Sequence, residues 1–173
     1  MSDLYREIFK LKKLERTGWK LSNIKGRTES DAEHTFSTIM LALEIMNKCE
    51  NNLDQLKVLK MIAYHEIGEI DVGDITLIDT EKRKHKYEDE KKCIQRIALK
   101  AQMPEIYDLW IEFEENKTDE ARFVKLLDRY DGVLQAKIYS EEDNRPELFE
   151  EFFTNAKKQV EEMESIIKKR KFN

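Results

Sequence analysis

Glycine and proline are scarce in this chain, with five glycines and two prolines among 173 residues. Sandwiches and barrels need turns at short intervals, and these two residues supply many such turns. A chain so poor in turn residues, with 40% hydrophobic residues to fill a core, favours long helices. The sequence therefore predicts an all-α helical bundle. Its length suits one domain, which we expect to span residues 1–173.

Charged residues of both signs are abundant and intermixed, and they leave a formal net charge of −5. Without a broad positive surface, neither a nucleic-acid polymer nor an anionic membrane is favoured as a partner. The two cysteines, Cys49 and Cys93, lie far apart in expected helices and indicate neither a disulfide framework nor a paired-cysteine metal site. No secretory leader is evident, and no stretch approaches the ~20 apolar residues of a membrane span. We therefore expect a soluble, cytoplasmic protein.

Apolar periodicity and capping residues predict the order of the helices. The clearest start is Ser30-Asp31-Ala32-Glu33, a capping box that places His34 in the first turn. On this helix we expect a core stripe formed by Phe36, Met40, Leu43 and Met46. The expected helices cover residues 3–14, 31–49, 55–67, 81–101, 104–113 and 119–139, with a C-terminal helix within 147–171.

The segment Tyr64–Asp74 holds one histidine and four carboxylates without a lysine or an arginine. An ordinary solvated face would mix both signs of charge, so this segment indicates a metal or proton-transfer site. His65 and Glu69 are four residues apart and share a helix face, whereas Glu66 is turned about 100° away. A glycine weakens the helix here, and the loop that follows leaves Asp74 free to turn back over the site.

Two distant residues extend this candidate site. His34 lies close to an apolar stripe, where a lone histidine is more often structural than a ligand. Asp128 falls on or beside the buried stripe of its helix, so we expect it to meet a cation, a donor or a metal. With His65 and Glu66 these residues form a mixed nitrogen and oxygen set that suits Mn²⁺, Fe²⁺, Co²⁺, Ni²⁺ or Zn²⁺. Hydrolysis of a phosphate ester by metal-activated water is the chemistry that such a set favours.

Residues 17–29 show no clear period and are expected to form a loop. Arg16, Lys25 and Arg27 could clamp an anion there, and Trp19 could stack on a flat ring. The alternative is a connector whose tryptophan fills the core, as large aromatic side chains most often do. Taken alone, these residues favour the packing role.

The lysine-rich start of the helix at 81–101, which includes His85, is the nearest thing to a basic patch. Its intermixed charges favour a solvated face, although a lysine here could face a bound phosphate. Asp131, one turn after Asp128, is left without an assigned role.

The order of these residues resembles a known family. A histidine, a histidine–carboxylate pair and a distant aspartate on separate helices are the signature of HD-domain phosphohydrolases. Here they are His34, His65-Glu66 and Asp128. Over roughly residues 3–140, further segments resemble the 5′-deoxynucleotidase branch of that family. These segments are Arg16-Thr17-Gly18-Trp19, Glu29-Ser30-Asp31-Ala32-Glu33-His34, Glu69 with Val72-Gly73-Asp74-Ile75, and Phe123-Val124-Lys125-Leu126-Leu127-Asp128.

The resemblance implies an HD-domain helical bundle that forms a homodimer. It implies an enzyme that removes phosphate from deoxynucleoside 5′-monophosphates with one divalent transition metal. Glu69 would orient or deprotonate the attacking water, and Asp74 would lie near the leaving 5′ oxygen. The implied metal ligands are His34, His65, Glu66 and Asp128.

For the segment around residues 16–27, the resemblance favours function over packing. It implies that Arg16 binds phosphate and that Trp19 flanks the nucleoside, with Arg27 and Lys25 as further anion contacts.

One residue departs from the family pattern. The family has aspartate after the second histidine, whereas this chain has Glu66, whose extra methylene moves the carboxylate by ~1.5 Å. Metal distances tolerate only about 0.2 Å, so the backbone or rotamer must adjust for Glu66 to ligate. The favoured hypothesis is a metal-dependent nucleotidase. The alternatives are a degenerate HD domain that binds a nucleotide or a protein without hydrolysis, and a phosphohydrolase for another phosphate ester.

Overall fold

The computed structural model describes residues 3–75 and 79–169. These residues are helical, apart from loops and one isolated antiparallel bridge between Glu15 and Ser30. This confirms the predicted all-α class. Among the described helices, none is long and apolar enough to cross a membrane. In chain order the helices are α1 (Asp3–Leu11), α2 (Thr17–Leu21), α3 (Asp31–Lys48), α4 (Gln55–Tyr64), α5 (Glu69–Val72), α6 (Thr80–Ala101), α7 (Glu105–Glu115), α8 (Asp119–Asp143) and α9 (Pro146–Lys168).

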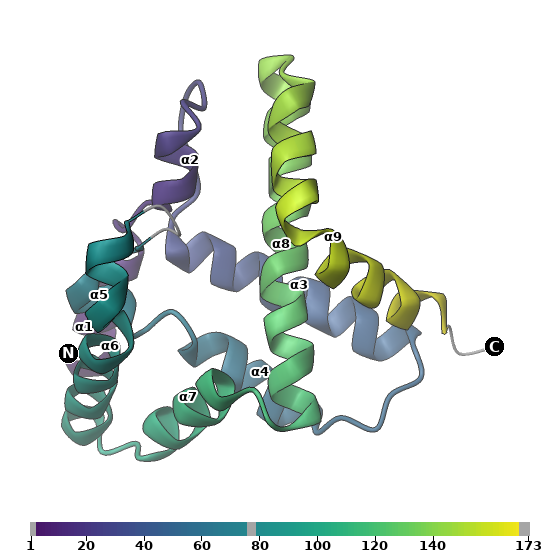
Figure 1. The fold of residues 1–173 in the computed structure, drawn as a ribbon. Coiled ribbons are helices and arrows are strands. Elements are labelled where there is room, and N and C mark those ends of the chain that lie inside the picture. The colour runs from purple at the N-terminus through teal and green to yellow at the C-terminus, as the bar shows by residue number, and fades with distance from the viewer. Residues whose placement is uncertain (1–2, 76–78, 170–173) are drawn as a thin grey trace.

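Two groups of helices are joined by α7 (Figure 1). On one side α1, α5 and α6 pack together, and on the other α8 and α9 form a long antiparallel pair. Helices α3 and α4 cross α8, and their apolar side chains form the main core with α7, α8 and α9. This core includes Ala42, Ile45, Met46, Val58, Met61, Ile62, Phe113, Val124, Leu127 and Met163. The crossing places the start of α3, the end of α4 and the middle of α8 close together.

The start of α3 is built as the sequence predicts. The Ser30 hydroxyl accepts a hydrogen bond from the Glu33 backbone N–H at 3.3 Å, and a Glu33 carboxylate oxygen accepts one from the Ser30 N–H at 2.9 Å. Both bonds satisfy amides that have no partner inside the helix. The capping box therefore fixes the backbone one residue before His34.

Several expected helix boundaries are wrong. Helix α1 ends at Leu11 rather than near residue 14, and Thr17–Leu21 forms the short helix α2 inside the expected loop. Asp54 caps α4, because its carboxylate accepts the Lys57 N–H at 3.1 Å. Helix α4 stops at Tyr64, so His65 and Glu66 lie in the turn that leads to α5.

The expected core stripe of α3 is also wrong. Phe36, Met40 and Leu43 are 65%, 51% and 42% exposed, whereas Met46 is buried. The buried face instead carries His34, Asp31, Thr38, Ala42 and Ile45 with Met46. Apolar spacing identified a real helical face, but this face points away from the core because the polar site residues take the inner one.

Four apolar residues on other helices are also exposed. They are Leu56 on α4, Leu99 on α6, and Leu134 and Ile138 on α8. Apolar spacing alone therefore does not show which side of a helix the core will cover.

We expect Gly68→Ala to destabilise the protein. A Cβ at residue 68 would lie 2.9 Å from the Glu90 Cβ and 3.4 Å from Trp110 Nε1. Overpacking of this kind costs about 1–3 kcal/mol of unfolding free energy. Gly132 in α8 is the matched control, because a Cβ there meets nothing within 4 Å, and alanine should stabilise the helix by about 0.5–1 kcal/mol. Urea unfolding measures both changes, and equal stability of the two variants would contradict the close contact at residue 68.

Candidate metal centre

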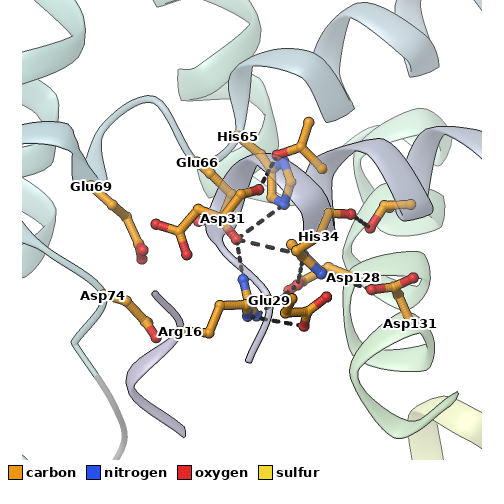
Figure 2. A network of polar contacts seen from close by, with 12 residues as sticks. Arg16, Glu29, Asp31, His34, His65, Glu66, Glu69, Asp74, Asp128 and Asp131 are labelled. Atoms are coloured by element: carbon orange, nitrogen blue, oxygen red, sulfur yellow. Dashed lines mark hydrogen bonds and ion pairs between the residues drawn. The ribbon is translucent and has the colours of Figure 1, made fainter. Parts of the chain in front are cut away.

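Four residues from three parts of the chain meet in one cluster (Figure 2). His34 comes from the first turn of α3, His65 and Glu66 from the turn after α4, and Asp128 from α8. Each offers one ligand atom, and these atoms all lie within 4.8 Å of one another. The structure thus brings together the four residues that the sequence proposes as metal ligands.

The two imidazoles present free ring nitrogens to the carboxylates. Oε1 of Glu66 lies 3.3 Å from His65 Nε2 and 3.6 Å from His34 Nε2, and Asp128 Oδ1 lies 3.2 Å from His34 Nε2. Both Nε2 atoms are buried, and neither makes a hydrogen bond of acceptable geometry with a described residue. Buried polar atoms normally have partners. Two nitrogen lone pairs facing two carboxylates are a donor set that fits a divalent metal ion.

The other ring nitrogen of each histidine is held by a hydrogen-bond acceptor. His34 Nδ1 lies 2.8 Å from Asp131 Oδ2, and His65 Nδ1 lies 2.6 Å from the Ile62 carbonyl oxygen. An acceptor at Nδ1 favours the tautomer that leaves the Nε2 lone pair available for a metal. Asp131 therefore orients His34, a role that its position one turn after Asp128 did not reveal.

The charged groups around the cluster favour the binding of a cation between the two imidazoles. Burial and Arg16 oppose a charge on His34, but Asp128 and Asp131 outweigh them and raise the pKa of His34 to about 9. Burial opposes ionisation of Glu66, yet His65, Arg16 and His34 hold its pKa well below the usual range. The site therefore stabilises positive charge at the ring nitrogens, where a proton and a metal ion compete.

Arg16 borders the cluster from the start of α2. Its Nη1 donates to Glu66 Oε1 at 2.7 Å, and its Nη2 lies 3.9 Å from Asp128 Oδ1. The neighbouring charges of Glu66 and Asp128 outweigh burial and raise the pKa of the guanidinium. A fixed cation thus lies directly beside the candidate metal ligands.

Glu69 and Asp74 reach the same region from α5 and the loop after it. Oε1 of Glu69 accepts from Lys86 Nζ at 2.7 Å, whereas its buried Oε2 has no hydrogen-bond partner among the described residues. Asp74 turns back toward the site, as expected, and is tied to α2. Its Oδ2 accepts the Thr17 N–H at 2.5 Å, and its carbonyl oxygen accepts the Thr17 hydroxyl at 2.7 Å.

Trp19 is a core side chain in this structure. It is 2% exposed, its ring stacks on Phe152 at 4.6 Å between centroids, and its Nε1 donates to Glu29 Oε1 at 2.8 Å. The packing interpretation of the sequence thus describes its position better than a role flanking the nucleoside. Lys25 and Arg27 do not join the cluster, because both are exposed and Arg27 pairs with Glu33.

Sequence reasoning assigned no role to Asp31, which the structure places beside the cluster. Its side chain is fully buried, and neither carboxylate oxygen has a hydrogen-bond partner in the described part of the chain. Burial and the charge of Glu66 raise the pKa of Asp31 to about 8. In the sequence it looked like an ordinary acidic residue in the first turn of a helix, and only the tertiary contacts distinguish it.

Comparisons with known proteins identify a matching family and similar sequences. A sequence profile described as HD domain matches residues 8–167. The 5′-deoxynucleotidase HDDC2 of Dictyostelium discoideum is 35% identical over 83% of this chain and 81% of its own length. The human 5′-deoxynucleotidase HDDC2 is 31% identical over 86% of this chain and 72% of its own length.

Solved structures share the fold. A conserved hypothetical protein from Pyrococcus furiosus superimposes with a TM-score of 0.79 at 28% identity, covering 96% of each chain. A predicted metal-dependent phosphohydrolase from Magnetospirillum magnetotacticum superimposes with a TM-score of 0.68 at 25% identity, covering 95% of this chain and 88% of the other. The profile covers most of the sequence, and the histidines and carboxylates of the expected signature converge in one site. This chain belongs to the HD domain family.

Proposed function

We propose that this protein is a metal-dependent 5′-deoxynucleotidase that releases phosphate from deoxynucleoside 5′-monophosphates. The observation that carries the proposal is the meeting of two buried imidazole nitrogens with Glu66 and Asp128, next to the cation of Arg16. Neither nitrogen has a hydrogen-bond partner among the residues that the structure describes. The relatives named 5′-deoxynucleotidase support the choice of substrate.

His34, His65, Glu66 and Asp128 would hold one divalent ion. Two nitrogen and two oxygen donors suit Mn²⁺, Co²⁺, Fe²⁺, Ni²⁺ or Zn²⁺. When bound, the ion lowers the pKa of water and polarises a phosphoryl oxygen, and open coordination positions leave room for both tasks. Asp131 and the Ile62 carbonyl oxygen keep both imidazoles oriented toward it.

The other residues of the site bind the phosphate, act on the attacking water and lie near the leaving group. Arg16 binds the phosphate, because its guanidinium is the cation beside the ligands and can pair with two oxygens at once. Glu69 orients the attacking water or takes a proton from it through Oε2, which has no hydrogen-bond partner in the described part of the chain. Asp74, fixed by Thr17, lies near the leaving 5′ oxygen.

The longer side chain of Glu66 is compatible with this function. Its Oε1 lies within 3.6 Å of both imidazole Nε2 atoms, so the turn after α4 accommodates the extra methylene. This position favours ligation over the alternative in which the domain has lost its metal and only binds a nucleotide or a protein.

We expect purified protein with Mn²⁺ or Co²⁺ to release phosphate from deoxynucleoside 5′-monophosphates and to lose this activity in EDTA. His65→Ala removes one nitrogen ligand and should lower metal affinity at least roughly tenfold. His85→Ala is the matched control, because His85 lies on the exposed side of α6. Elemental analysis and a phosphate-release assay measure occupancy and activity separately.

The same assay tests the alternative functions. A protein without bound metal that hydrolyses no phosphate ester across a panel of ions would contradict the proposal. If the wild type is inactive and its Glu66→Asp variant gains activity, the result would favour a degenerate domain that binds a nucleotide or a protein without hydrolysis. Release from another ester alone would keep the chemistry and change the substrate.

We expect Arg16→Met to lower kcat/KM at least about tenfold, because a hydrogen bond to a charged group contributes about 1.5–3 kcal/mol. Arg27→Met is the matched control, since Arg27 is exposed and pairs with Glu33. It should change kcat/KM less than about threefold. Steady-state kinetics with one deoxynucleoside monophosphate compare the two variants. An equal loss of kcat/KM in both variants would contradict a role for Arg16 in binding the phosphate.

We also propose that two copies of the chain form a homodimer through the exposed apolar face of α3 and α8. The family resemblance implies a dimer, and large exposed apolar patches mark interaction surfaces. A groove runs along this face, and Asp131 is one of the residues that line it. The carboxylate of Asp131 also contacts His34, so the face lies next to the metal cluster. The apolar residues of this face are Phe36, Met40, Leu43, Leu134 and Ile138.

We expect Phe36→Glu to convert the dimer into a monomer, because it places a charge where the second copy would pack. Leu99→Glu is the control, since Leu99 is 73% exposed on α6 and lies outside this face. Light scattering after size-exclusion chromatography measures the mass of each form. A wild-type monomer, or a Phe36→Glu dimer, would contradict this interface.

A further inference from the structure

Lys86 connects α6 to the turn that carries the candidate metal ligands. Its Nζ lies 2.7 Å from Glu69 Oε1 and 3.3 Å from Glu90 Oε1. The side chains of Glu69 and Glu90 are 7% and 8% exposed, and that of Lys86 is 27% exposed. Burial opposes the charge on Lys86, but the two carboxylates outweigh it and raise the pKa of the ammonium. The lysine is therefore charged and held between two carboxylates.

The backbone around this ion pair is tightly packed. Gly68 lies so close to α6 that a Cβ there would be 2.9 Å from the Glu90 Cβ. The Glu69 N–H donates to the Glu66 carbonyl oxygen at 3.1 Å. Glu90 and Lys86 are one turn apart on a long helix, so they present a fixed surface to the turn. The contact of Lys86 with Glu69 is therefore set by packing as well as by charge.

This contact ties only one oxygen of the Glu69 carboxylate. Oε1 is bonded to Lys86, while Oε2 is buried without a hydrogen-bond partner among the described residues. Figure 2 shows Asp31, Glu66 and Glu69 directed into the same part of the site. The charges of Glu66, Asp74 and Asp31 all act on Glu69. Repulsion from these carboxylates would move an untethered Glu69 away from the site.

We propose that Lys86 is a positioning residue that holds the Glu69 carboxylate with Oε2 facing the reaction site. This inference rests on the proposed nucleotidase function. Glu90 forms a second ion pair with the lysine at 3.3 Å, so the position of the ammonium does not depend on one partner alone. A carboxylate locked by a supporting contact presents its free oxygen to water in one geometry. The hydrogen bond of Lys86 goes to Glu69 and its other ion pair to Glu90, so both contacts are with carboxylates. We therefore assign Lys86 to Glu69 rather than to the substrate phosphate.

Lys86→Met should lower kcat at least about tenfold and leave KM within about twofold of wild type. Metal content should match that of wild type, because no candidate metal ligand is bonded to Lys86 in this structure. The thermal midpoint should fall, because the variant leaves the buried carboxylates of Glu69 and Glu90 without their cation. Lys86→Arg should recover kcat to within about threefold, since it restores a cation at this position. Lys92→Met is the matched control, because Lys92 is an exposed lysine on α6 that pairs with Asp89, and it should retain full activity.

A double-mutant cycle tests whether Lys86 acts through Glu69. In a Glu69→Gln background, Lys86→Met should lower kcat by less than about twofold further. A fully additive loss would overturn the inference. So would a rise in KM in place of a fall in kcat, or a loss of bound metal that matches the loss of activity.

The proposed function and this inference fail in different ways. An active wild type with an equally active Lys86→Met variant overturns the positioning role and leaves the nucleotidase proposal standing. A wild type that releases no phosphate overturns the nucleotidase proposal and, with it, this inference.

Discussion

The site depends on two buried imidazole nitrogens that have no hydrogen-bond partner among the described residues. His34 and His65 are each held at Nδ1, which leaves both Nε2 atoms facing Glu66 and Asp128. Burying such atoms without a partner costs free energy, about 1–3 kcal/mol for each group. A bound cation removes that cost for the imidazoles and the carboxylates together. The crossing of α3, α4 and α8 brings the four residues of this cluster together.

The cluster is surrounded by buried carboxylates, and their excess negative charge accounts for the two cations beside it. Glu66, Glu69 and Asp31 are buried near one another, and burial with mutual repulsion raises the pKa of Glu69 and Asp31. Arg16 counters this charge on one side and Lys86 on the other. Arg16 immediately precedes α2 and Lys86 lies in α6, so the two cations are far apart in sequence. In the proposed mechanism, substrate binding and water positioning depend on separate cations.

The sequence predicted much of this architecture, for local physical reasons. Scarce turn residues indicated helices, and the capping box gave the start of α3 because its hydrogen bonds lie within four residues. Apolar spacing failed on α3, where Phe36 and Met40 are exposed and polar residues line the inner face. A periodic pattern shows that a helix has an apolar side, but it does not show whether the domain core or another surface will cover that side.

The sequence by itself determined the helical class, the candidate ligands and the family, because these depend on residue types and their order. Only the tertiary structure decided that Asp131 orients His34, that Asp31 is buried beside Glu66, and that Lys86 bonds to Glu69. It also decided that Trp19 packs in the core. These facts depend on contacts between segments separated by many residues, and no local pattern encodes which charges will share a buried space.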